Sequence, residues 1–209
     1  MNKKLANFLN YIEPYKGILL FLFLLFFFHF FWKIAVEGDM GDEPMRIFGK
    51  EYHPAWFDSA TLLLAKSTYW LIRLFPGTEN LILDGTLLYF TGGGIRINIV
   101  WGCTGIKQMF IFTCIMLLYR GPFLKKLWYI PLGCIVLSAY NIIRMAGIVV
   151  LTNQHPERFD SLHDGIFRYI YYGLIFLLWV IWEEFIVKKQ NKHEKQLGKN
   201  TETEKGNAV

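Results

Sequence analysis

Four long runs of apolar residues dominate the pattern of hydrophobic and polar positions along the chain. They occupy residues 17–36, 104–119, 127–152 and 166–187. A helix needs about 20 mostly apolar residues to cross the hydrocarbon core of a bilayer, which is roughly 30 Å thick. The second run is the shortest, and it reaches that length only with the polar residues before it. We therefore predict an all-α integral membrane protein with about four transmembrane helices.

The segment 56–75, between the first two runs, is apolar but carries three charges. Asp58, Lys66 and Arg73 interrupt it. On insertion scales a charge costs about 2.5–3.5 kcal/mol at the centre of a bilayer. We therefore expect an amphipathic helix in the outer membrane interface, with its two tryptophans at the level of the lipid headgroups. A pair of extra membrane spans is the alternative.

Residues 80–100 are expected to form a small β-hairpin. Two short apolar runs, 81–83 and 86–90, flank Asp84-Gly85, a dipeptide typical of a type I′ turn. Three consecutive glycines follow. They predict a flexible turn, because the lysine and hydroxyl residue of a phosphate-binding loop are absent beside them.

The basic residues predict the orientation of the chain in the membrane. They gather in three regions, namely 3–16, 120–126 and 188–199. The segments after the first and third apolar runs are acidic or mixed. By the positive-inside rule the basic regions and both termini are cytoplasmic, and residues 37–102 lie outside. We expect a multi-pass protein of the inner (cytoplasmic) membrane whose first run is a retained anchor, because no small-x-small cleavage site follows Trp32.

The predicted organisation is one membrane-embedded domain followed by a tail. The domain covers residues 1–187, and the lysine-rich residues 188–209 are expected to be a disordered, basic cytoplasmic extension. The net charge of +5 does not indicate a nucleic-acid partner, because the charges sit at segment ends. Three cysteines match no zinc spacing, so neither a metal nor a cofactor is expected.

Arg144 and Asn141 are the clearest polar residues within an apolar run. Arg144 lies eight residues before the end of the third run, about 12 Å below it at roughly 1.5 Å per residue. Asn141 lies three residues earlier, on the same helical face. Polar groups in membrane helices are costly and often functional. A structural hydrogen bond between helices is the alternative.

Cys103 stands at the start of the second run, beside Gly102 and before Thr104-Gly105. A helix N-terminus lowers a thiol pKa, and a neighbouring arginine would lower it further. The flanking glycines let a substrate backbone approach closely. An inert cysteine is the alternative here, and Cys114 and Cys134 are expected to be small buried apolar residues.

His163 is the favoured histidine. It precedes the fourth run, at the predicted membrane level of Cys103 and Arg144. His155 is second to it, whereas His29 and His53 are expected to be a packing residue and a solvated residue. A thiol, an imidazole and a fixed cation are the ingredients of cysteine-based acyl transfer.

These residues resemble the motifs of the exosortase/archaeosortase family. The family has three motifs: a Cys-x-Gly, an Asn-x-x-Arg and a histidine before the last core helix. The similar positions in this chain are Cys103-Thr104-Gly105, the segment Asn141 to Arg144, and His163. Their order and spacing agree over a core of residues 80–187. The short chain looks like a compact branch, such as the XrtF-like branch of Bacteroidetes.

The resemblance implies a membrane-embedded cysteine protease or transpeptidase. Such enzymes cleave exported proteins at a C-terminal sorting signal, made of a short motif, a transmembrane helix and a basic cluster, and transfer them to a cell-surface acceptor. Cys103 would form the thioester, His163 would act as general acid/base, and Arg144 would stabilise the oxyanion. Supporting or substrate-binding roles would fall to Asn141, Gly105 and Thr104.

Two other functions are compatible with the same sequence. A non-enzymatic membrane assembly or export subunit would use Arg144 and Asn141 to join helices. A lipid or glycan transferase is the other, but its paired acidic or histidine-acid motifs are not evident. Glu183-Glu184 lies near the predicted cytoplasmic end, where it more simply marks a membrane boundary.

Overall fold

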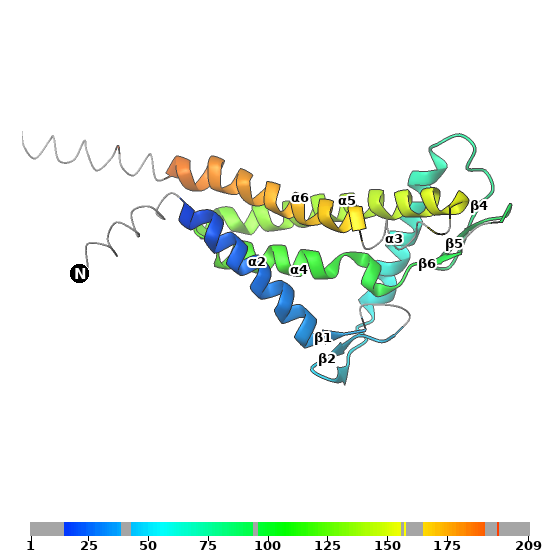
Figure 1. The fold of residues 1–209 in the computed structure, drawn as a ribbon, viewed down its shortest axis with the longest axis horizontal. Coiled ribbons are helices and arrows are strands. Elements are labelled where there is room, and N and C mark those ends of the chain that lie inside the picture. The colour runs from blue at the N-terminus through cyan, green and yellow to red at the C-terminus, as the bar shows by residue number, and fades with distance from the viewer. Residues whose placement is uncertain are drawn as a thin grey trace, which may run out of the picture.

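The computed structural model describes residues 15–38, 43–93, 96–155, 157, 165–190 and 196. The four apolar runs form helices that alternate in direction, three of them side by side and the first slanting away from them (Figure 1). They are α2 (Lys16–Ala35), α4 (Ile106–Leu118), α5 (Phe123–Gln154) and α6 (Phe167–Trp182). Between them lies a core of large side chains, among them Ile111, Phe112, Ile115, Ile175 and Trp182. Many other apolar side chains of these helices point outward, as expected for surfaces that face lipid.

Three helices of the described residues are long and apolar enough to cross a membrane. They are Lys16–Ala35, Phe123–Asn153 and Phe167–Gln190. The helix of the second run is shorter, with 13 residues from Ile106 to Leu118. It starts late because Gly105 adopts a left-handed conformation with φ of 77°, which separates it from the residues before. A multi-pass membrane protein is therefore supported, whereas the expected number of four spans is not confirmed.

The helix α3 (Trp56–Arg73) crosses one end of the bundle instead of running along it (Figure 1). We call this end the α3 end. Its buried residues recur every three or four positions and include Phe57, Leu64 and Ile72. Leu64 and Ile72 face α5 and the neighbouring β-strands, whereas Phe57 packs in a separate cluster with residues at the end of α2. With its three charges, α3 is not among the three helices suited to crossing a membrane. Its position in the membrane interface stays a prediction.

The predicted hairpin is present, with a different turn. The strands β4 (Leu81–Asp84), β5 (Leu87–Phe90) and β6 (Ile97–Asn98) form an antiparallel sheet in that order. Asp84 pairs with Leu87, so the loop is Gly85-Thr86 and not the expected Asp84-Gly85. In this loop only Gly85 has a positive φ, of 60°, which is the pattern of a type II′ turn. The prediction of a type I′ turn was therefore wrong.

A second three-stranded sheet was not predicted. It consists of β1 (Val36–Glu37), β2 (Arg46–Ile47) and β3 (Lys50–Glu51). Phe48 and Gly49 join the last two strands, both with positive φ, as a type I′ turn requires. Phenylalanine is not a residue that signals such a turn, and strands of two residues leave no periodic pattern.

The last helix is longer than expected. After Trp182 it continues through a π-helical stretch, Glu183–Val187, and remains helical to Gln190. Residues 188–190, which the prediction assigned to the tail, are therefore helical. Residues 191–195 and 197–209, where disorder was predicted, lie outside the described residues.

Candidate active site

Cys103 lies in a short 3₁₀ turn, Trp101–Thr104, which joins β6 to α4 at the α3 end of the bundle. Its backbone N–H donates a hydrogen bond of 2.9 Å to the carbonyl of Val100. The hydroxyl of Thr104 donates to the carbonyl of Trp101. These two bonds close the turn on itself, and Cys103 lies three residues before α4 begins at Ile106.

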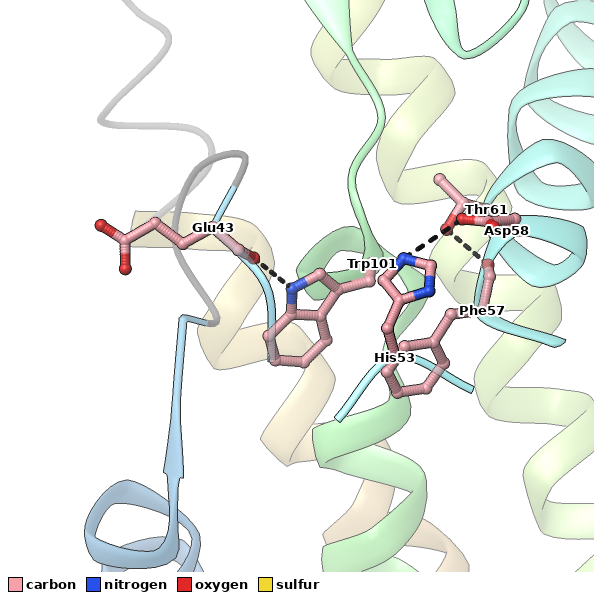
Figure 2. Close-up of polar contacts among 6 residues, drawn as sticks. All are labelled: Glu43, His53, Phe57, Asp58, Thr61 and Trp101. Carbon is pink, nitrogen blue, oxygen red and sulfur yellow. Dashed lines mark hydrogen bonds and ion pairs between the residues drawn. The ribbon is translucent and has the colours of Figure 1, made fainter. Parts of the chain in front are cut away.

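Trp101 connects this turn to α3 and to the backbone at Glu43. Its indole stacks on Phe57 of α3, with ring centroids 5.8 Å apart and planes 5° from parallel. The indole N–H donates a 3.0 Å hydrogen bond to the backbone carbonyl of Glu43 (Figure 2). Close to the start of α3, Nε2 of His53 lies 3.5 Å from a carboxylate oxygen of Asp58, and Figure 2 marks this contact. The sequence analysis missed Trp101, because a tryptophan before a helix carries no signal of its partners.

Asn141 and Arg144 of α5 meet the Cys103 turn in the interior. The amide Nδ2 of Asn141 donates a 2.7 Å hydrogen bond to the backbone carbonyl of Cys103. Nη1 of Arg144 donates to Oδ1 of Asn141 at 3.4 Å. The exposed fractions are 1% for Asn141 and 7% for Arg144. The structure thus joins three of the predicted site residues in one chain of contacts.

A sequence model of the transmembrane exosortase family matches residues 52–181. The chain belongs to the transmembrane exosortase family. The match covers more than half of the chain and includes all of α3, so it begins well before the expected core at residue 80. Membership of a compact XrtF-like branch is not confirmed by it. Neither the curated proteins nor the solved structures compared with this chain match it.

Burial has the largest effect on the pKa of the Cys103 thiol in this exosortase. Burial raises the pKa of the Cys103 thiol, while a hydrogen bond with the backbone at Val100 and the positive charge of Arg144 act in the opposite direction with smaller effect. The expectation of a lowered pKa was therefore wrong. It assumed a thiol inside the first turn of a helix, whereas the 3₁₀ turn keeps Cys103 outside α4 and against apolar neighbours. The resting thiol is protonated at neutral pH.

Gly105 and Thr104 support the turn of this exosortase. A Cβ atom at Gly105 would lie 2.7 Å from the hydroxyl of Tyr171 and 3.4 Å from the amide of Asn141. With φ of 77° the position is also strained for any other residue. Thr104 is buried, and the bond from its hydroxyl stays within the turn. Both residues were predicted from the sequence to have supporting or substrate-binding roles. Tyr171 was not predicted, because the sequence shows it only as one tyrosine within an apolar run.

The remaining candidates lie elsewhere or outside the described residues. His163, the favoured histidine, is among the undescribed residues. His155 follows α5, is exposed and contacts Glu157 at 3.1 Å. His29 of α2 lies 2.8 Å from the hydroxyl of Tyr172 of α6, between two helices. Within the described part of the chain, no three His, Cys, Asp or Glu side chains gather as a metal site would require.

Cys114 and Cys134 are separate from the site. Both are half-buried, on α4 and α5. The sulfur of Cys134 lies 3.7 Å from the hydroxyl of Thr113. Neither takes part in the hydrogen bonds that join Cys103, Asn141 and Arg144, and their interpretation as small buried apolar residues stays a prediction.

Proposed function

We propose that this protein is a membrane-embedded cysteine peptidase and transpeptidase. Family membership supports a role in the processing and sorting of membrane-bound substrates. The observation that carries the proposal is the group of half-buried Cys103 with buried Asn141 and Arg144, in which a thiol-bearing turn is hydrogen-bonded to an amide that also binds a guanidinium. This group supplies a nucleophile, a fixed cation and a residue that orients both, which acyl transfer uses together with a general base.

In this proposal the sulfur of Cys103 attacks the carbonyl carbon of the scissile peptide bond. The C–N bond breaks, the amine leaves with a proton, and the N-terminal product remains as a thioester on Cys103. An amine or hydroxyl of a cell-surface acceptor then attacks the thioester and releases the thiol. Water in place of the acceptor gives hydrolysis.

The roles of the other residues follow from their chemistry. Arg144 stabilises the oxyanion, because a fixed donor in a water-poor site is aimed at the developing negative charge. Asn141 holds the guanidinium and the backbone of the Cys103 turn. Since burial raises the pKa of the Cys103 thiol, a general base must take its proton. We assign this role, and protonation of the leaving amine, to His163 from its sequence position.

The substrates proposed are exported proteins with a C-terminal sorting signal, made of a short motif, a transmembrane helix and a basic cluster. Charge asymmetry of the loops supports a protein in the inner membrane with the α3 end, and therefore the site, facing outward. A substrate held by its own transmembrane helix would meet Cys103 where that helix leaves the membrane.

A non-enzymatic assembly or export subunit is the second candidate. One observation favours it: the amide of Asn141 binds the backbone of Cys103 and not its thiol, which is also how polar residues join membrane helices. In this case Cys103 would be replaceable by alanine without loss of function.

The deciding experiment compares cysteine variants in cells that lack the native gene. The measurement is the size of exported proteins whose C-terminus combines an apolar helix and a basic cluster. We expect Cys103→Ala to abolish processing and Cys114→Ala, as the matched control, to support it. Purified protein should carry a hydroxylamine-sensitive substrate adduct only when Cys103 is present. Normal processing by Cys103→Ala at matched protein levels would establish the assembly role instead.

A further inference from the structure

Tyr171 of α6 contacts the turn of α5 that precedes Asn141. Its side chain is 1% exposed, and its hydroxyl donates a 3.0 Å hydrogen bond to the backbone carbonyl of Leu137. In an α-helix that carbonyl also accepts the backbone N–H four residues on, which here belongs to Asn141. Tyr171 therefore holds the turn from which the Asn141 side chain projects.

The same hydroxyl lies against the turn that carries Cys103. The space that a Cβ atom of Gly105 would occupy is 2.7 Å from the Tyr171 oxygen and 3.4 Å from the Asn141 amide. Gly105 follows Cys103 by two residues and connects its turn to α4. The Tyr171 phenol thus touches both the Cys103 turn and the part of α5 that precedes Asn141. The distance between these two elements decides how far the thiol lies from the Asn141–Arg144 pair.

The Tyr171 ring is itself held in one orientation. Tyr140 of α5 packs edge-on against it, with ring centroids 5.1 Å apart and planes at 87°. The hydroxyl of Tyr140 donates a 3.1 Å hydrogen bond to the carbonyl of Phe167 at the start of α6. Tyr140 of α5 therefore bonds to α6, and Tyr171 of α6 bonds to α5. These two bonds between the helices leave the Tyr171 hydroxyl little freedom to move.

We propose that Tyr171 is a positioning residue, which sets the placement of Cys103 relative to Asn141 and Arg144. This inference rests on the proposed acyl-transfer function. The phenol itself takes no part in bond making; it acts through Gly105 and the Leu137 carbonyl. Removal of its oxygen leaves a gap beside Gly105, so the Cys103 turn gains room to shift. A misplacement of about 1 Å at a reacting group costs on the order of 100-fold in rate.

The matched control for Tyr171→Phe is Tyr129→Phe. Tyr129 is also buried, and its hydroxyl donates a 2.7 Å hydrogen bond to a backbone carbonyl of α6, that of Leu178. Both substitutions remove one hydroxyl and one bond between α5 and α6. Only Tyr171 touches the Cys103 turn, so a purely structural role predicts equal effects of the two changes.

The test measures how fast a methanethiosulfonate reagent modifies Cys103 in purified protein with the background Cys114→Ala and Cys134→Ala. We expect Tyr171→Phe to speed this modification at least threefold and to slow substrate processing about 10- to 100-fold, as misplacement of the nucleophile requires. Tyr129→Phe should change neither by more than about twofold while lowering the melting temperature to a similar extent. Equal effects of the two variants on Cys103 modification would overturn the inference.

A double substitution checks the contact itself. Gly105→Ala places a methyl group against the Tyr171 oxygen, so adding Tyr171→Phe should recover part of the stability lost by Gly105→Ala. Additive losses would contradict the contact. Thiol modification does not depend on catalysis, so this inference and the proposed function fail separately: normal processing by Cys103→Ala refutes the function alone.

Discussion

The side-chain amide of Asn141 donates a 2.7 Å hydrogen bond to the backbone carbonyl of Cys103. The two residues are far apart in the sequence, and the bond joins α5 to the turn before α4. Because Asn141 also accepts from Arg144, one buried amide connects the predicted nucleophile with the predicted cation. An asparagine suits this place, since its side chain donates with one atom and accepts with the other.

Arg144→Lys should abolish processing or nearly do so. A lysine is a point charge on a flexible stem, so it cannot keep the bond to Asn141 and face a substrate oxyanion at the same time. Arg46→Lys is the control, because Arg46 lies in an exposed ion pair with Glu51. The measurement is the processing rate at matched protein levels. Equal activity of both variants would rule out a role for the planar guanidinium.

His163→Ala should lower processing at least 100-fold, while His155→Ala leaves it near normal. Loss of a general acid/base typically costs about 10²–10⁴ in rate. His155 is exposed and paired with Glu157. The same processing assay compares the two variants. A stronger effect at His155 than at His163 would reverse the assignment of the catalytic base.

Modification of Cys103 by N-ethylmaleimide should rise with pH, with a midpoint above the ordinary thiol value of about 8.5. The thiolate is the reactive form, and burial raises the pKa of Cys103, so the thiolate fraction at neutral pH is small. Arg144→Gln should move the midpoint higher still, because the cation that favours the thiolate is lost. A midpoint below the ordinary value would contradict the burial of the thiol.

Gly133→Ala should destabilise the bundle by about 1–3 kcal/mol, the usual cost of overpacking. A Cβ atom there would lie 2.3 Å from the ring of Phe112, which is fully buried. Gly173→Ala is the control, since nothing lies within 4 Å of its Cβ position. Thermal unfolding in detergent measures both. Equal melting temperatures would show that α4 and α5 pack differently.

Membrane orientation can be measured with single cysteines in a background without the native three. Asp84→Cys, on the hairpin, should react with an impermeant maleimide in intact cells. Lys125→Cys, at the start of α5, should react only after the membrane is permeabilised, as the positive-inside rule requires. Both positions are exposed, so access to the side chain does not limit labelling. Labelling of Lys125→Cys in intact cells would invert the topology.

The sequence by itself determined the elements that depend on local composition. Hydropathy located α2, α5 and α6, because a span needs a long apolar run wherever it packs. The charges of α3 separated it from these helices, and two short apolar runs on either side of Asp84-Gly85 predicted the β4–β5 hairpin. Cys103, Asn141 and Arg144 stood out because polar groups in apolar runs are costly and few.

The tertiary structure alone decided how these elements meet. The break at Gly105 shortens α4, because the left-handed glycine is packed against Tyr171 and Asn141, which come from other helices. Apolar residues of α3, α5 and the β4–β6 sheet cover Cys103, so desolvation outweighs the nearby cation and the pKa of the Cys103 thiol rises, against the expectation from its place near a helix start. Patterns along a chain report local periodicity, whereas burial and contacts between distant segments exist only once the helices pack.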